Sequence, residues 1–296
     1  MKIFFLERLK DKTLQDAISF IEESEEKEAN CVELMSRLLD DSWKLSVYSY
    51  FILYEGESLF KKKILAIFMK STGGLLQFCI PQPERFLKSR KFARAVKSLF
   101  EGKLYCIMGE KSAAKLIAKI AEKYAPENHL NEERDYLLLS YHPENLPDGL
   151  IERKFDYEPI KCGQDDSEKL FELHKQYNIV EVFPKGKEYS ADICRRTLEL
   201  MLKKQMTYAI EQDGQFVAKA GSNAIGKNFV QLGGVYTDEK YRSKGMAQCL
   251  VDFISRQVVL EGKKPVLFVR TKNESAKKAY RKVGYIYQND YAILYY

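Results

Sequence analysis

The chain has 296 residues, of which 45% are hydrophobic and 30% are charged. This composition is typical of a globular protein, and the length predicts two domains of about 140 to 150 residues each. The net charge of +6 is smaller than the concentrated positive charge expected of nucleic-acid-binding proteins. No apolar run in the sequence approaches the roughly 20 residues that span a bilayer, so we expect neither a nucleic-acid partner nor a membrane.

Cysteine and histidine spacing argues against a metal site. The six cysteines and three histidines show neither C-x-x-C nor H-E-x-x-H spacing. We therefore expect reduced thiols, no disulfide framework and no metal. The apolar patch at the start of the sequence is short and interrupted by charges, unlike the long apolar segment of a signal peptide. The resulting expectation is a cytoplasmic location.

In the first half of the chain, helical and strand-like patterns alternate. Apolar residues at helical spacing predict two amphipathic helices between residues 13 and 40. Aromatic and branched runs separated by Gly-containing turns predict strands at 45–54, 64–70 and 75–80. The remaining predicted elements are a helix at 84–100, a strand at 104–108, a helix at 112–124 and a strand at 136–141.

A polar segment at 142–149 with two prolines and one glycine cannot continue a helix or strand. It predicts a boundary between two domains, residues 1–150 and 151–296. In the second half, Asp213-Gly214 is a hairpin signal between two predicted strands. The predicted elements there are strands at 155–161, 206–211, 215–220, 229–237, 266–270 and 285–296, and helices at 168–177, 191–204, 244–260 and 274–283.

One loop between a predicted strand and a predicted helix has the features of a phosphate-binding turn. It reads Arg-Ser-Lys-Gly-Met-Ala over Arg242–Ala247. Gly245 lets the backbone approach anionic oxygens closely, and small Ala247 keeps the first helical turn open. Arg242 and Lys244 add positive charge beside the N-terminus of the helix. By itself the hexapeptide fits equally well a solvated turn that caps a helix.

A second motif follows one helix and one strand later. Residues 273–280 read Asn-Glu-Ser-Ala-Lys-Lys-Ala-Tyr, and residues 284–285 read Gly-Tyr. With the preceding loop, this segment resembles the GCN5-related N-acetyltransferase (GNAT) superfamily, whose loop reads Arg/Gln-x-x-Gly-x-Gly/Ala and whose next segment reads Asn-x-x-Ala-x-x-x-Tyr, ending in Gly-Phe/Tyr. The resemblance covers residues 155–296 and implies an α/β fold with a mixed sheet that transfers an acyl group from acyl-CoA.

The first half has the same predicted order of helices and strands as an acetyltransferase domain. Residues 1–150 are therefore interpreted as an N-terminal α/β domain that could be a diverged copy of the second. Its turns at 102–103 and 109–111 contain no equivalent of the acyl-CoA loop. Such a copy would serve as scaffold or substrate wall, and an unrelated α/β module fits the same pattern.

The resemblance also implies which residues bind acetyl-CoA, the expected cosubstrate. In this fold the strand before the loop splays away from its neighbour, and Val235 and Tyr236 would pair with the pantetheine arm. Asn273 would bond the same arm or only cap the helix that it precedes. The pyrophosphate would be held by the backbone N–H groups of Arg242, Ser243, Lys244, Gly245, Met246 and Ala247.

Tyr280 is the residue matched to a catalytic role in the second motif. A phenol with a pKa of about 10 can protonate a leaving thiolate whose conjugate acid has a pKa near 8.5. Tyr280 also fits a core position, because it recurs with Ala276 and Val283 at helical spacing. No general base is evident, since residues 228–235 contain no carboxylate and the proton could leave through water. Glu181 either attracts a cationic acceptor or is an exposed loop carboxylate.

These residues lead to the hypothesis of an N-acetyltransferase that moves an acetyl group from acetyl-CoA to a primary amine. The acceptor would be a small molecule or a peptide. A longer acyl chain and a non-catalytic acyl-CoA-binding or sensing protein stay open as alternatives. A nucleic-acid-binding adaptor would rest on the basic charge balance alone.

Overall fold

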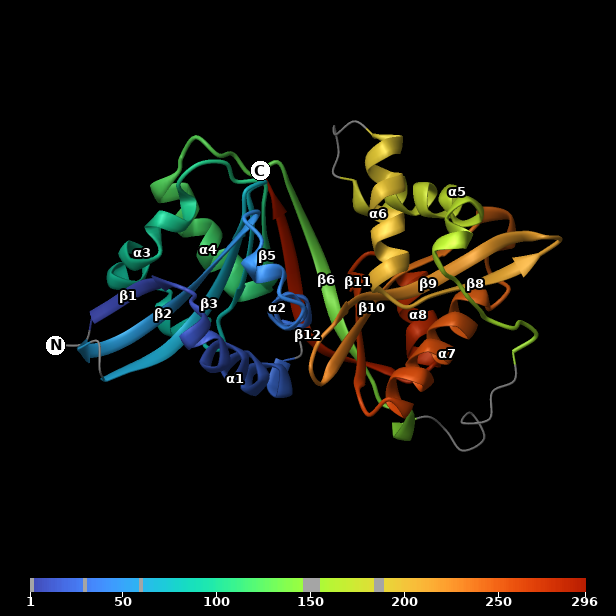
Figure 1. Ribbon diagram of the computed structural model, residues 1–296, viewed down its shortest axis with the longest axis horizontal. Helices are drawn as coiled ribbons and strands as arrows, with labels where there is room; N and C mark the ends of the chain where they lie inside the picture. The colour runs from blue at the N-terminus through green and yellow to red at the C-terminus, as the bar shows by residue number, and fades with distance from the viewer. Residues whose placement is uncertain (1–2, 29–30, 59–60, 146–154, 184–188) are drawn as a thin grey trace. The chain divides into compact units, whose positions relative to one another are not determined.

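The computed structural model describes residues 3–28, 31–58, 61–145, 155–183 and 189–296 (Figure 1). The chain divides into two compact units: Met1–Leu137 with Asn289–Tyr296, here unit 1, and Leu138–Gln288, here unit 2. Each unit combines helices with a mixed sheet, so the predicted fold class is confirmed. The predicted boundary at residue 150 lies outside the described residues. None of the helices in the described ranges is long and apolar enough to cross a membrane.

The elements of the chain repeat in the same order. The first series is β1 (Ile3–Arg8), α1 (Asp11–Glu28), α2 (Val32–Leu39), β2 (Tyr48–Ser58), β3 (Lys61–Ser71), β4 (Leu75–Cys79), α3 (Arg90–Ala95), β5 (Cys106–Glu110), α4 (Lys111–Tyr124) and β6 (Glu132–Tyr141). The second series is β7 (Ile160–Lys161), α5 (Ser167–Tyr177), α6 (Ala191–Lys204), β8 (Thr207–Gln212), β9 (Gln215–Ile225), β10 (Phe229–Thr237), α7 (Met246–Leu260), β11 (Lys264–Arg270), α8 (Glu274–Lys282) and β12 (Tyr285–Tyr295).

Strand pairing repeats as well. In unit 1, β1 to β4 pair antiparallel in sequence order and β4 then pairs parallel with β5. In unit 2, β7 to β10 pair antiparallel and β10 then pairs parallel with β11. The strands that end the two series are exchanged: the last residues of β6 belong to unit 2, and the last residues of β12 belong to unit 1, where they pair antiparallel with β5. The two series therefore share one topology.

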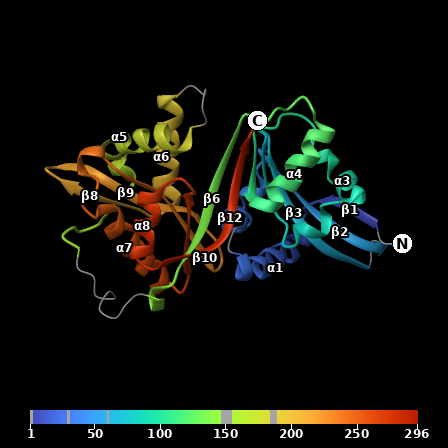
Figure 2. The same cartoon turned by 180° about the vertical axis from the view of Figure 1, so that it is seen from behind.

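The sheet of unit 1 has a core on each face, as the alternation of side chains along its strands requires. In β3, Ala66 and Phe68 point into a cluster with α3 and α4, whereas Ile67 and Met69 point into a cluster with α1 and α2. Figures 1 and 2 show α4 on one face of these strands and α1 on the other. In unit 2, α5 and α6 lie on one side of β8–β10 and α7 lies on the other (Figure 1).

Two predicted elements are corrected by the structure. The predicted helix at 84–100 is three short segments, Pro83–Phe86, α3 and Lys97–Phe100, because the Ser89 side chain accepts a hydrogen bond from Phe92 N and starts a new helix there. The predicted strand at 155–161 is reduced to the two residues of β7. Pro159, directly before β7, has no N–H to donate to a strand ladder.

The exchanged end of β12 predicts that a residue near the C-terminus stabilises unit 1. Leu294 is 2% exposed in the cluster with α3 and α4. Leu294→Ala should lower the free energy of unfolding of unit 1 by about 2–5 kcal/mol, because it leaves a cavity in that cluster. Fluorescence of Trp43, the single tryptophan of the chain, measures this directly because Trp43 lies in unit 1.

The matched control is Ile286→Ala on the same strand, which truncates a partly exposed residue of unit 2. In this variant, the denaturant midpoint of the unfolding transition followed by Trp43 fluorescence should equal that of the wild type. An unchanged Trp43 transition in Leu294→Ala would contradict the assignment of the C-terminal residues to the core of unit 1.

Candidate functional site

The two parallel strands of unit 2 separate part of the way along their length. β10 pairs with β11 from Phe229 to Leu232, opposite Lys264 to Leu267. β10 then continues to Thr237 and β11 to Arg270, and no further pairs between them occur in this described stretch. Backbone groups in the second half of β10 are thus available to a ligand on the β11 side. This is the splayed strand that the resemblance predicts, and it contains Val235 and Tyr236.

A bulge on the other edge of β10 begins where the strands separate. The register with β9 passes from Gly233–Gly221 to Tyr236–Lys219, so β10 has one extra residue there. Gly234 has a positive φ of 61°, which L side chains rarely adopt. A Cβ on Gly233 would lie 2.0 Å from the side-chain amide nitrogen of Asn223, an exposed residue whose side chain would have to move. Gly234 is therefore the position where this backbone path favours a glycine.

The predicted phosphate loop joins this strand to α7. Its backbone turns sharply, with positive φ values of 64° at Ser243 and 84° at Gly245. Gly245 is the N-cap of α7, and among the described residues no side chain caps this end. The N–H groups of the first turn, which begins with Met246 and Ala247, therefore lack a side-chain acceptor at the positive end of a 15-residue helix. This geometry fits an anion.

Two cations flank the loop. Arg242 donates from Nε to the carbonyl of Thr237 at 3.2 Å and lies 3.3 Å from a Glu239 carboxylate oxygen. The Lys244 ammonium lies 5.2 Å from the centre of the Tyr241 ring. Both side chains are held beside the helix N-terminus without being buried.

Unit 1 has a different structure at the corresponding place. Its helix after the parallel strand, α3, has six residues, and the Ser89 hydroxyl accepts a hydrogen bond from Phe92 N at 3.1 Å. A 3₁₀ segment that begins at Pro83 replaces the glycine loop. A side chain of the protein thus caps the start of α3, whereas no side chain in the described part of the chain caps the start of α7.

Tyr280, on α8, is almost fully buried at 7% exposure and packs near Tyr285, with ring centres 6.2 Å apart. Burial raises the pKa of Tyr280 above its usual value, and the neighbouring Tyr177 and Glu181 raise it further. The hydroxyl stays protonated at neutral pH and is a weaker acid than a free phenol. Glu181, 99 positions earlier in the sequence, thus acts electrostatically on Tyr280 in the folded chain.

Asn273 and Glu181 have protein partners. The Asn273 side-chain oxygen accepts a hydrogen bond from Ala276 N at 3.1 Å, so it caps α8. Its contact with a pantetheine arm stays a prediction. Glu181 lies in the segment Asn178–Val182, which follows α5. One of its carboxylate oxygens is 4.0 Å from Arg270 Nη1. Arg270 partly neutralises the charge that Glu181 would offer to a cationic acceptor.

Two buried basic residues of unit 2 were not predicted from the sequence. Lys219, on β9, is 1% exposed, and its ammonium lies 3.0 Å from the Gly234 carbonyl and 4.7 Å from the centre of the Tyr177 ring. His174, on α5, is also buried, and burial with the Lys219 charge lowers its pKa to about 4. The sequence feature that could have indicated the burial of Lys219 is its position within the apolar run Phe216–Ala220.

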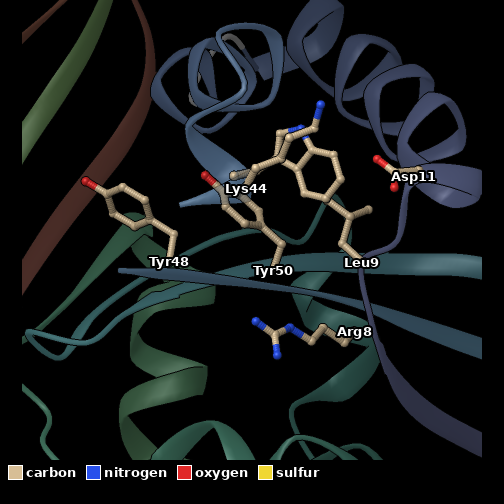
Figure 3. Close-up of a pocket in the computed structure, with 7 residues that line it drawn as sticks. Arg8, Leu9, Asp11, Lys44, Tyr48 and Tyr50 are labelled. Carbon is tan, nitrogen blue, oxygen red and sulfur yellow. The ribbon is translucent and has the colours of Figure 1, made fainter. Parts of the chain in front are cut away.

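A cavity in unit 1 lies apart from these motifs. It has a volume of about 290 Å³ and includes Trp43, Tyr48 and Tyr50 among its lining residues (Figure 3). Arg8 points to the opposite side of the strands from Tyr48 and Tyr50 (Figure 3). The Trp43 indole nitrogen and the Tyr50 hydroxyl are buried, so a molecule in the cavity does not reach them. Among the described residues, no group of His, Cys, Asp and Glu is placed to hold a metal ion.

Comparisons with known proteins agree with the architecture. Residues 217–293 match the family model described as FR47-like protein. A search of curated proteins finds no match. A GNAT-family acetyltransferase from Colwellia psychrerythraea is 11% identical with a TM-score of 0.56, covering 98% of this chain and 99% of that chain.

Two further solved structures also align over nearly the whole chain. A Drosophila protein is 11% identical with a TM-score of 0.66, and a tandem GNAT protein from the clavulanic acid biosynthesis pathway is 10% identical with a TM-score of 0.61. Each alignment covers 99% of this chain and 98% of the other. The chain therefore has the fold of the GCN5-related N-acetyltransferases, and the resemblance indicated by its two motifs is confirmed.

Proposed function

We propose that the protein is an N-acetyltransferase that moves an acetyl group from acetyl-CoA to a primary amine, and that unit 2 holds the active site. The observation that carries the proposal is the combination of the splayed β10 with the uncapped N-terminus of α7. Together they offer strand-like hydrogen bonds for an amide-rich arm and N–H groups for a pyrophosphate. Unit 1 carries the same topology without that combination, which supports a scaffold role for it.

In the proposed reaction, the amine nitrogen forms a bond to the thioester carbonyl carbon, and the carbon–sulfur bond breaks. Orientation supplies much of the rate, because the reactants are held together on one strand edge. The leaving thiolate takes a proton, for which Tyr280 is the proposed donor. The amine must be neutral to attack, so it either binds in its neutral form or loses a proton in the site. Because β10 contains no carboxylate, that proton would leave through water.

Glu181 is the proposed contact for the acceptor, since it lies near Tyr280. The cytoplasmic location expected from the sequence remains a prediction, as does the division at residue 150.

A non-catalytic acyl-CoA-binding protein is the second candidate. It is favoured by the lack of a carboxylate on β10 and by the raised pKa of Tyr280, and it differs from the enzyme in turning over no amine.

Gly245→Val should weaken acetyl-CoA binding about tenfold or more, because a branched side chain at positive φ distorts the turn that aims the first N–H groups of α7. Isothermal titration calorimetry measures the affinity. Gly262→Val is the matched control: Gly262 has a φ of 76° beyond the other end of α7, and, as at Gly245, no described atom lies within 4 Å of an added Cβ. Equal affinities in the two variants would show that the loop is an ordinary turn.

Tyr280→Phe keeps the ring and removes the only proton that the side chain can give. Its turnover should fall about 100-fold or more, while its acetyl-CoA affinity and melting temperature remain those of the wild type. Because the acceptor is unidentified, a panel of polyamines, amino acids and peptides is screened first by release of free CoA.

The matched control for Tyr280→Phe is Tyr285→Phe, on a neighbouring tyrosine that is also buried and whose hydroxyl lies 2.7 Å from Ser255 Oγ. This control should lose about 1 kcal/mol of stability and keep its turnover. Full turnover in Tyr280→Phe, or activity lost in proportion to stability, would assign Tyr280 to the core. An acetyl-CoA-binding protein that acetylates no amine in the panel would favour the second candidate.

A further inference from the structure

Lys219 is a buried basic residue on β9 of unit 2. No ion pair between Lys219 and a carboxylate occurs among the described residues, although burying an unpaired ammonium is costly. Its hydrogen-bond acceptor is the main-chain carbonyl of Gly234, at 3.0 Å, and the Tyr177 ring lies 4.7 Å from the ammonium. A hydrophobic residue would fill this site at a lower cost in solvation. The contact with Gly234 is therefore the feature that a lysine provides here.

The carbonyl that Lys219 holds belongs to the bulge of the splayed strand. Lys219 is paired opposite Tyr236, and its side chain reaches back to the extra residue between Gly233 and Tyr236. Because a trans peptide directs its C=O and N–H to opposite sides, fixing the Gly234 carbonyl also fixes the direction of the Val235 N–H. The positively charged ammonium that donates to the Gly234 carbonyl also makes the Val235 N–H a stronger donor, because hydrogen bonds polarise one another.

We propose that Lys219 is a positioning residue for acyl-CoA, which clamps the Gly234–Val235 peptide of β10 so that its N–H faces the bound thioester arm. The inference rests on the proposed function, since it concerns the same strand. The clamp lies just beyond Leu232, where the pairing with β11 ends. Beyond that point the second half of β10 has no ladder with β11 to fix its peptides, and the ammonium provides the missing restraint.

Burial excludes direct contact between Lys219 and the reacting atoms. At 1% exposure, the amine lies within the protein, against α5 and the bulge. Lys219 thus acts through the strand rather than as a base on the acceptor.

The clamp should depend on pH because Lys219 can lose its charge. Burial lowers the pKa of Lys219 to about 8. The titratable groups that face it are His174 and Tyr177 on α5, Cys194 on α6 and Cys162 before α5. Burial lowers the pKa of His174 to about 4 and raises that of Cys162 to about 12, so neither changes charge near pH 8. The charged clamp is complete below about pH 8 and is lost as the pH rises above it.

The test is calorimetric titration of the full chain with acetyl-CoA from about pH 7 to about pH 9.5, a range that brackets the titration of Lys219. Wild-type affinity should fall about tenfold across this range. Lys219→Met, which keeps an unbranched side chain one atom shorter and removes its charge, should bind about tenfold more weakly at pH 7 and lose most of the pH dependence. Lys203→Met, at an exposed position of α6, is the control and should behave as the wild type.

The outcomes separate the role of Lys219 from the proposed binding of acetyl-CoA. If wild type binds acetyl-CoA and Lys219→Met binds equally well with the same pH profile, Lys219 is only structural and the inference is overturned, even if the melting temperature falls. If Lys219→Met does not fold by circular dichroism, a wild-type affinity that is constant across the range overturns the inference, and a tenfold fall near pH 8 supports it. If wild type does not bind acetyl-CoA at any pH, the proposed function itself fails.

Discussion

The site depends on the separation of β10 from β11 after Leu232. A parallel sheet normally uses the backbone groups of both strands, and a ligand can pair with a strand only where its neighbour departs. In this chain the departure coincides with a bulge built from Gly233 and Gly234, which changes the direction of the strand before the loop. The uncapped start of α7 follows directly. The open edge of β10 and the N-terminus of α7 are thus joined by a single loop.

The repeated topology places two different helix starts at corresponding positions. Both series place a helix after the parallel-pairing strand, but α7 begins at a glycine whereas α3 begins at Ser89, whose hydroxyl accepts a hydrogen bond from Phe92 N. A serine cap of this kind stabilises a short helix by about 1 kcal/mol and engages one of the N–H groups of its first turn. The exchange of the terminal strands makes each compact unit depend on residues from the other half of the sequence. Each compact unit therefore contains residues from both halves of the sequence.

Local patterns predicted most of unit 2 and part of the site. The bounds of α6 and β10 agree with the sequence because their periodicity and turn residues are local. β1 was not predicted as a strand because its six residues are stabilised by pairing with β2, about 50 residues away. The motifs identified the loop glycine and Tyr280 as candidates, and their roles stay predictions. Lys219 was not identified, because only the fold shows that its side chain is buried against a carbonyl of the next strand.

Hydrogen–deuterium exchange of the full chain with and without acetyl-CoA tests the central claim most directly, because it locates binding by individual backbone segments. We expect slower exchange at Val235 and Tyr236 in β10 and in the first turn of α7, with the first turn of α3 unchanged. Protection confined to unit 1, or an exchange pattern that acetyl-CoA does not alter, would contradict this expectation.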